Sequence, residues 1–181
     1  MSLVVVAGLA SQWTAAGGGD TSGTIVPTSN VSITPSGMQG GFGDLDDDPD
    51  SPDGNWLLRP TAQDATLTDA TFGMSTPSGT PGGTDAQEVR VLVRKTDRDG
   101  VHQTTGVDPT VSLLIDGTVV LTDSAIGDVS SVVLSANFDD AVSSDWSTLE
   151  VRVQQTGNGG GSPPGRRYVE VGAIEVNWSA T

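Results

Sequence analysis

Cysteine is absent from this sequence of 181 residues, and histidine occurs once, as His102. The lack of cysteine excludes disulfide bonds, thiolate nucleophiles and zinc sites built from thiolates. A single histidine leaves little for acid–base catalysis or metal coordination. His102 lies in a polar stretch with Asp97 and Asp99, and no Gly-x-Ser-x-Gly motif supplies a nucleophile for it to activate. We therefore expect His102 to be a surface residue.

Basic residues are scarce: lysine and arginine number 8 against 23 aspartates and glutamates, and the formal net charge is -15. Binding to nucleic acid depends on basic side chains that neutralise phosphates, and anionic membrane surfaces repel a chain of this charge. No apolar run approaches the roughly 18 residues that a membrane-spanning helix needs. The apolar run Leu3–Ala10 is not preceded by a basic residue, unlike a secretory signal. We expect neither nucleic acid nor membrane among the partners.

The pair of carboxylates that a glycoside hydrolase needs is also missing from the sequence pattern. The chain has four glutamates, Glu88, Glu150, Glu170 and Glu175, and each falls at an outward position of an alternating stretch. We expect Glu170 and Glu175 to lie in water, where nothing would prepare one carboxyl as an acid and another as a base. The sequence therefore predicts a protein that is not an enzyme.

Apolar and polar residues alternate with the period of two that is typical of half-buried strands. In Gln87–Lys95, for example, Val89, Val91 and Val93 share one face. Asp116-Gly117, between two apolar runs, is the strongest hairpin signal in the chain. The strands predicted on these grounds are Gln87–Lys95, Thr110–Ile115, Thr118–Leu121, Val129–Ser135, Leu149–Gln155 and Tyr168–Trp178, with weaker ones at Asn55–Leu58 and Ala65–Phe72. The one helix signal is a turn or two near Asp139–Trp146.

This pattern predicts an all-β fold, an antiparallel β-sandwich of jelly-roll-like or immunoglobulin-like type with an extended N-terminal arm. Residues 1–43 would form the arm and the first strands, and residues 44–181 the sandwich domain. In the arm, Leu3, Val4, Val5 and Val6 form an apolar stretch that could add a strand to a partner's sheet. The alternative is that these four residues are the first strand of the chain's own sandwich. Trp13 is expected to anchor the arm in a partner's pocket.

Six aspartates lie within ten residues at positions 44–53. Ca²⁺ takes six to eight oxygen ligands, and Asp48, Asp50 and Asp53, followed by Gly54, resemble a calcium loop. The spacing is not that of an EF-hand. Calcium bound by these three carboxylates is therefore one hypothesis, and a solvated acidic loop held by Asx-turns is the other.

Tryptophan and arginine offer further binding hypotheses. Trp56, Trp146 and Trp178 could stack on sugars if they were exposed, but with a single tyrosine in the chain we expect them to fill or seal the core. Arg166 and Arg167 follow a Gly/Pro-rich stretch that lacks the lysine of a phosphate-binding loop. These arginines could pair with an acidic neighbour on an adjacent copy.

Four segments of the chain resemble small structural proteins of tailed bacteriophages. They are Asp46–Leu57 (DDDPDSPDGNWL), Gln87–Thr96 (QEVRVLVRKT), Pro109–Val120 (PTVSLLIDGTVV) and Val169–Trp178 (VEVGAIEVNW). The resemblance spans residues 44–178. It implies a β-sandwich component of the virion, such as a capsid decoration protein, a tail protein or a fibre-associated module. It brings no catalytic residue with it.

The resemblance and the composition together predict a capsid decoration, or cement, protein on the outer surface of a phage particle. Its partners would be the major capsid protein and neighbouring copies of itself, in a homo-oligomer for which a trimer is one form. Apart from the hypothetical calcium, no cofactor is expected. The alternative is a tail or fibre module that binds glycan on the host surface.

Overall fold

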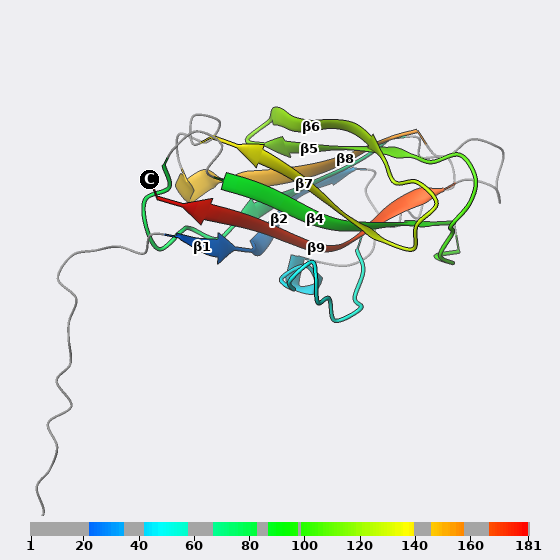
Figure 1. Cartoon of the computed structure of the whole chain (residues 1–181), viewed down its shortest axis with the longest axis horizontal. Helices are drawn as coiled ribbons and strands as arrows, with labels where there is room; N and C mark the ends of the chain where they lie inside the picture. The colour runs from blue at the N-terminus through cyan, green and yellow to red at the C-terminus, as the bar shows by residue number, and fades with distance from the viewer. Residues whose placement is uncertain are drawn as a thin grey trace, which may run out of the picture.

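In a computed structural model, residues 22–34, 42–57, 67–82, 87–97, 99–139, 146–157 and 167–180 are described (Figure 1). These residues form strands and two single turns of 3₁₀ helix, η1 (Phe42–Asp44) and η2 (Trp146–Thr148). The strands are β1 (Ser22–Ile25), β2 (Pro27–Thr34), β3 (Leu67–Met74), β4 (Gln87–Thr96), β5 (Thr110–Ile115), β6 (Thr118–Ala125), β7 (Val132–Phe138), β8 (Glu150–Thr156) and β9 (Tyr168–Ser179). The predicted all-β class is confirmed.

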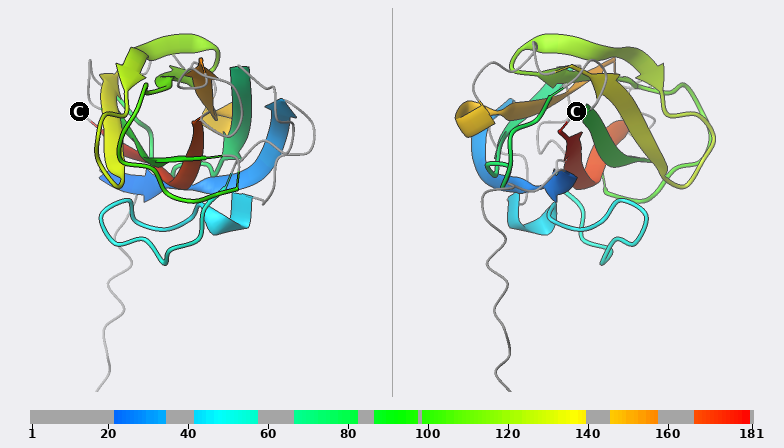
Figure 2. Two further views of the ribbon diagram at one scale, coloured as in Figure 1. Left: turned by 90° about the vertical axis from the view of Figure 1, so that its right-hand side faces the viewer. Right: turned by 60° about the vertical axis from the view of Figure 1, so that its left-hand side comes forward.

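The strands form two antiparallel sheets that pack face to face (Figure 2). One sheet has four strands in the order β1-β9-β4-β7, and the other has five in the order β2-β3-β8-β5-β6. Along one side of the sandwich, Val26 alone separates β1 in the first sheet from β2 in the second. Both β1 and β2 fall in the N-terminal zone where first strands were expected, and both belong to this one sandwich.

The order of the strands is that of a jelly roll. With β2 set aside, the first strand pairs with the last, β1 with β9, and the next pairs follow inward as β3 with β8, β4 with β7 and β5 with β6. This is the pattern of a long hairpin rolled up into two sheets. An immunoglobulin domain instead places its first two strands side by side in one sheet. Of the two predicted sandwich types, the topology therefore selects the jelly roll.

The hairpin predicted at Asp116-Gly117 is present between β5 and β6. Asp116 and Gly117 have φ angles of 46° and 79°. Positive φ at both central residues is the requirement of a type I′ turn, which matches the twist of the two strands. The bounds of β5 are those predicted, whereas β6 runs on to Ala125 beyond the predicted end at Leu121.

The remaining strand predictions differ from the structure mainly at their ends. The strand expected from Val129 begins at Val132, and the strand expected at Asn55–Leu58 is a single bridge from Leu57 to Val171 among the described residues. In place of the helix expected near Asp139–Trp146, the structure has the η2 turn, and residues 140–145 lie outside the described part. Residues 1–21, with the predicted arm residues Leu3, Val4, Val5, Val6 and Trp13, also lie outside it.

The hydrophobic core lies between the two sheets. The three valines predicted to share one face of β4, Val89, Val91 and Val93, are fully buried there. The facing sheet contributes Phe72, Leu113 and other residues of β3, β5 and β8. The periodicity of the sequence therefore identified the side of β4 that faces the core.

Replacing Leu113 tests this assignment. Leu113→Ala is expected to lower the free energy of unfolding by about 2–5 kcal/mol, because it opens a cavity in the core. Val119→Ala on the paired strand β6 is the matched control, because half of the Val119 side chain is exposed, and its cost is expected to stay near 0.5 kcal/mol. Urea denaturation measures both values. Equal losses in the two variants would contradict the core described above.

Candidate functional site

Two arginine–glutamate pairs lie on the outer face of β4 and β9, the face turned away from the core. Arg90 is the direct cross-strand partner of Glu175, and Arg94 is that of Glu170. Arg90 Nη1 donates to Glu175 Oε1 at 2.5 Å, and Arg94 donates through Nε and Nη2 to Glu170 Oε2 at 2.8 and 2.6 Å. Opposite charges placed directly across an antiparallel pair stabilise the sheet.

A β-bulge brings both glutamates to this face. Glu170 and Glu175 are five positions apart, so strict alternation would place them on opposite faces of β9. The register shifts where Leu92 pairs with Ala173 and Val93 with Val171, which leaves Gly172 as an extra residue in β9. A Cβ atom at Gly172 would lie 2.9 Å from the ring of Trp56. Only glycine fits this position without displacing the tryptophan.

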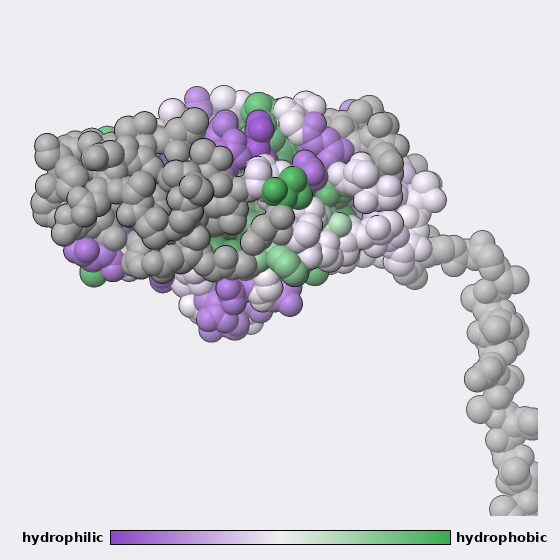
Figure 3. Space-filling model, turned by 180° about the vertical axis from the view of Figure 1, so that it is seen from behind, coloured by the Kyte–Doolittle hydropathy of each residue, from purple (hydrophilic) through white to green (hydrophobic). Residues whose placement is uncertain are grey.

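The acidic segment, residues 42–57, covers the two arginine–glutamate pairs. It attaches to β9 at two points: Ile174 N–H donates to the carbonyl of Leu45 at 3.1 Å, and Leu57 and Val171 exchange two backbone hydrogen bonds of 2.7 Å. Leu45 and Leu57 are fully buried, so the segment is packed as well as hydrogen-bonded. Between these points it projects from the sandwich with a hydrophilic surface (Figure 3).

The expectation that Glu170 and Glu175 lie in water was wrong. Each glutamate is only 6% exposed. Segment 42–57 covers this part of the sheet, and Arg94 is sandwiched between Glu170 and the ring of Trp56, whose centroid lies 4.2 Å from Arg94 Cζ. A buried carboxylate persists because an arginine pairs with it.

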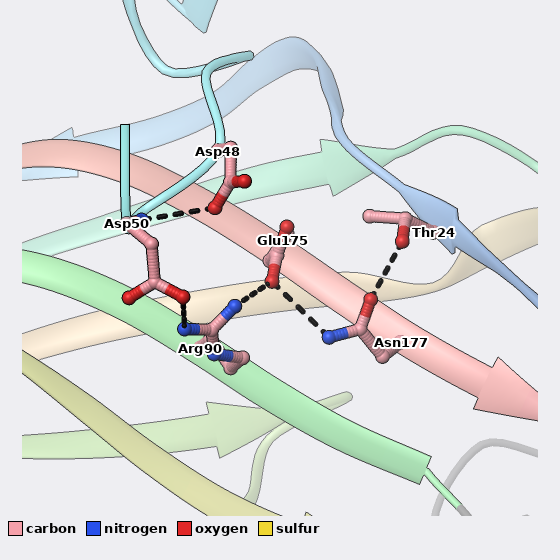
Figure 4. Close-up of polar contacts among 6 residues, drawn as sticks. All are labelled: Thr24, Asp48, Asp50, Arg90, Glu175 and Asn177. Atoms are coloured by element: carbon pink, nitrogen blue, oxygen red, sulfur yellow. Dashed lines mark hydrogen bonds and ion pairs between the residues drawn. The ribbon is translucent and has the colours of Figure 1, made fainter. Parts of the chain in front are cut away.

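Two of the three predicted calcium ligands, Asp48 and Asp50, are bonded within the acidic segment and to the sheet (Figure 4). Asp48 Oδ1 accepts the N–H of Asp50 at 2.9 Å, and Asp50 Oδ2 accepts Arg90 Nη2 at 2.8 Å. Asp53 accepts the backbone N–H and the side-chain amide of Asn55 at 2.7 and 2.5 Å. The backbone hydrogen bond from Asn55, with a contribution from Asp47, holds the pKa of Asp53 below its ordinary value.

These hydrogen bonds include the Asx-turns expected of a solvated acidic loop. Within the described ranges, no three histidine or acidic side chains gather closely enough to hold a metal ion. The hydrogen bonds that Arg90 makes to Asp50 and to Glu175 raise its pKa above the ordinary value, which keeps it charged as the link between segment and sheet. Calcium binding by Asp48, Asp50 and Asp53 stays a prediction.

The described tryptophans pack against other side chains, as expected. Trp178 is 2% exposed in the core, and Trp146 stacks on Phe138 with 6.1 Å between ring centroids. Trp56 lies on Gly172 and Arg94.

His102 is half-buried rather than a surface residue, because its backbone bridges to Thr96 at the end of β4 and its Nε2 atom is buried. Arg167 donates to the carbonyl of Thr105 at 3.4 Å, and Arg166 lies outside the described residues.

One buried basic residue, Lys95, was not predicted from the sequence. Of the eight basic residues, seven are arginine and Lys95 is the one lysine. Its side chain is fully buried. Two features of the sequence indicate its burial. Lysine occurs once in the chain, and position 95 continues the alternation that places Val91 and Val93 on the inner face of β4.

Comparison with known proteins adds no family to these observations. No family model matches the chain, and no curated protein matches it. Among the described residues, the structure has no helix of the length and apolar character needed to span a membrane.

Replacing Arg90 tests the link between segment and sheet. Arg90→Ala removes the charged partner of the buried Glu175 and, among the described residues, leaves it the hydrogen bond from Asn177 at 3.1 Å. We therefore expect the free energy of unfolding to fall by about 1–3 kcal/mol. Asp50→Ala is the matched control, because this partner of Arg90 is 69% exposed and exposed ion pairs contribute about 0–1 kcal/mol. Chemical denaturation compares the two variants. A loss for Asp50→Ala as large as that for Arg90→Ala would show that the exposed contact holds the segment.

Removing divalent ions decides between the two hypotheses for the aspartates. The carboxylates of Asp48, Asp50 and Asp53 already accept hydrogen bonds within the chain, so we expect EDTA to leave the melting temperature unchanged. A lower melting temperature in EDTA, restored by added Ca²⁺ and absent in Asp48→Asn, would establish the calcium site instead.

Proposed function

We propose that this chain is a non-enzymatic structural protein of a bacteriophage virion, a capsid decoration protein on the outer surface of the shell. Its partners are the major capsid protein and neighbouring copies of the same chain. The resemblance of residues 44–178 to small phage structural proteins supports this proposal. The jelly roll supports it by analogy of fold, because this architecture recurs in viral capsid domains.

One observation carries the proposal: the described residues, which begin at Ser22, already form both sheets of the sandwich. The nine strands of the described residues begin at Ser22, and the jelly-roll order is complete among them. Ser22 pairs with Ser179 at one end of the sandwich, so residues 1–21 are joined to the domain at that end. We infer that the apolar stretch Leu3–Val6 adds a strand to the sheet of a capsid subunit.

The charge of the chain suits a protein present in many copies on one particle. The acidic segment presents Asp46, Asp48, Asp50 and Asp53 to solvent. A strongly negative surface keeps neighbouring copies soluble and limits nonspecific association. Contacts with capsid subunits would then come from the apolar N-terminal stretch rather than from the body of the sandwich.

The alternative, a glycan-binding tail module, has one supporting feature. A shallow groove of about 280 Å³ is lined partly by hydroxyl and carboxylate side chains, among them Ser29, Thr148 and Glu150. The described tryptophans do not provide a platform for sugar stacking, because Trp178 is buried and the other two pack on neighbouring side chains. We therefore place glycan binding second.

Deleting residues 2–16 tests the role of the N-terminal stretch. The variant is expected to keep the melting temperature of the full chain, because the described strands begin at Ser22. It is also expected to lose binding to phage particles that lack the native protein, measured by co-sedimentation. The full chain, and a variant with residues 2–16 intact and Val119→Ala on the sandwich, are the controls. Loss of folding on deletion would show that the stretch is a core strand, and retained binding would remove it from the interface.

Cryo-electron microscopy of the native particle tests the location. Density for the sandwich on the outer shell, with the N-terminal stretch against capsid subunits, is the expected result. Density at the tail tip, together with binding of the purified chain on a glycan array, would replace decoration by glycan recognition.

A further inference from the structure

Lys95 is a buried cation at the end of β4. Its side chain is fully buried, although lysine is among the residues least often found inside a protein. It points inward in the same phase as Val91 and Val93, toward the space between the two sheets. The seven other basic residues of the chain are arginines. The one basic side chain with a nucleophilic amine is therefore the one that is buried.

Three segments meet at the amine of Lys95. Its Nζ atom lies against Oδ1 of Asp108, which precedes β5, and donates to the carbonyl of Gly127 at 3.1 Å. Oδ1 of Asp108 is itself buried. The carboxylate of Asp128 lies 3.9 Å from Nζ and is largely exposed. One carboxyl is thus held in contact with the amine inside the protein, and a second stands beside them at the surface.

The surroundings favour an uncharged amine. Burial lowers the pKa of Lys95 below its ordinary value, and the nearby Arg167 lowers it further, while Asp128 opposes both. A buried ammonium–carboxylate pair carries a desolvation cost for both ions. Transfer of the proton from Nζ to Asp108 removes both charges. The products are a neutral amine and a carboxylic acid in contact, which are the reactants of amide formation.

We propose that Lys95 and Asp108 are joined by an intramolecular isopeptide bond. The lone pair of Nζ attacks Cγ of the protonated Asp108 carboxyl, and an N–C bond forms. The Cγ–O bond to the hydroxyl then breaks and one water molecule leaves. Asp128 takes the proton that Nζ loses and returns it to the departing hydroxyl. No oxidant, reductant or further reactant takes part.

The surrounding hydrogen bonds fit the product as well as the reactants. The amide nitrogen keeps one hydrogen, and the carbonyl of Gly127 is already in place to accept it. The amide is uncharged, so the buried site no longer holds an ion. The bond would tie the end of β4, in the four-stranded sheet, to the start of β5, in the five-stranded sheet. It would lie at the end of the sandwich opposite the Ser22–Ser179 pair.

The intact mass of the purified full-length chain tests this bond directly. The expected mass is lower than that of the sequence by one water molecule, about 18 Da. After denaturation, an amine-reactive reagent is expected to modify the N-terminal amine alone, because Lys95 is the one lysine. Digestion with trypsin is expected to yield one branched peptide that contains both Lys95 and Asp108.

Variants at the two positions serve as controls. Lys95→Arg and Asp108→Ala cannot form the amide and are expected at the full mass of their sequences. Asp108→Asn can still form it by release of ammonia, and is expected to be lighter by about 17 Da. A wild-type chain at its full sequence mass, with two reactive amines after denaturation, would overturn the proposal. This result needs no variant, so it holds even where a substitution prevents folding.

Discussion

The pairing of β4 with β9 is the interaction on which the rest of the structure depends. Its inner face supplies the core valines of β4, and its outer face carries the two arginine–glutamate pairs. The acidic segment attaches to β9 at Leu45 and Leu57. Lys95 stands at the end of the same pairing. The core, the outer cover and the buried amine are therefore all placed by the register of these two strands.

That register depends on Gly172. Without the bulge, strict alternation would pair Glu170 with Lys95 on the inner face, and Val171 would stand opposite Arg94. With it, Arg94 meets Glu170 across the sheet, and the ring of Trp56 packs where a side chain at position 172 would otherwise lie. The bulge thus serves the charge pairs and the packing of the acidic segment together. Glycine usually weakens a strand, but Gly172 allows both faces of β9 to be buried.

Patterns among residues close in sequence predicted the strands and the hairpin turn. The alternation around Val91 and the turn at Asp116-Gly117 depend on neighbours in sequence, and both were confirmed. The burial of Glu175 was not predictable in this way, because its cover comes from residues 42–57. The same limit applies to Lys95. Its phase along β4 was visible in the sequence, but the meeting with Asp108 requires two sheets to pack.

The aspartates of the acidic segment show how a crowded set of like charges is accommodated. Asp48 and Asp53 accept hydrogen bonds from backbone N–H groups two residues on, which is the geometry of an Asx-turn. Asp50 is bonded to Arg90, so the segment is tied to the sheet by one of its own charges. The repulsion among the other carboxylates is spread over an exposed surface, where water screens it. Hydrogen bonds and an ion pair within the chain thus hold the loop in the form that the structure describes.

If the chain is held to a shell through residues 1–21, the two ends of the sandwich bear mechanical load in different ways. A pull on Ser22 acts first on the pairing of β1 with β9, and through β9 it reaches β4. Hydrogen bonds between neighbouring strands carry the load up to this point. At the far end of β4, the contact of Lys95 with Asp108 joins this strand to the start of β5 in the other sheet. A covalent bond at that point would keep the two sheets together when the strand pairing alone is loaded.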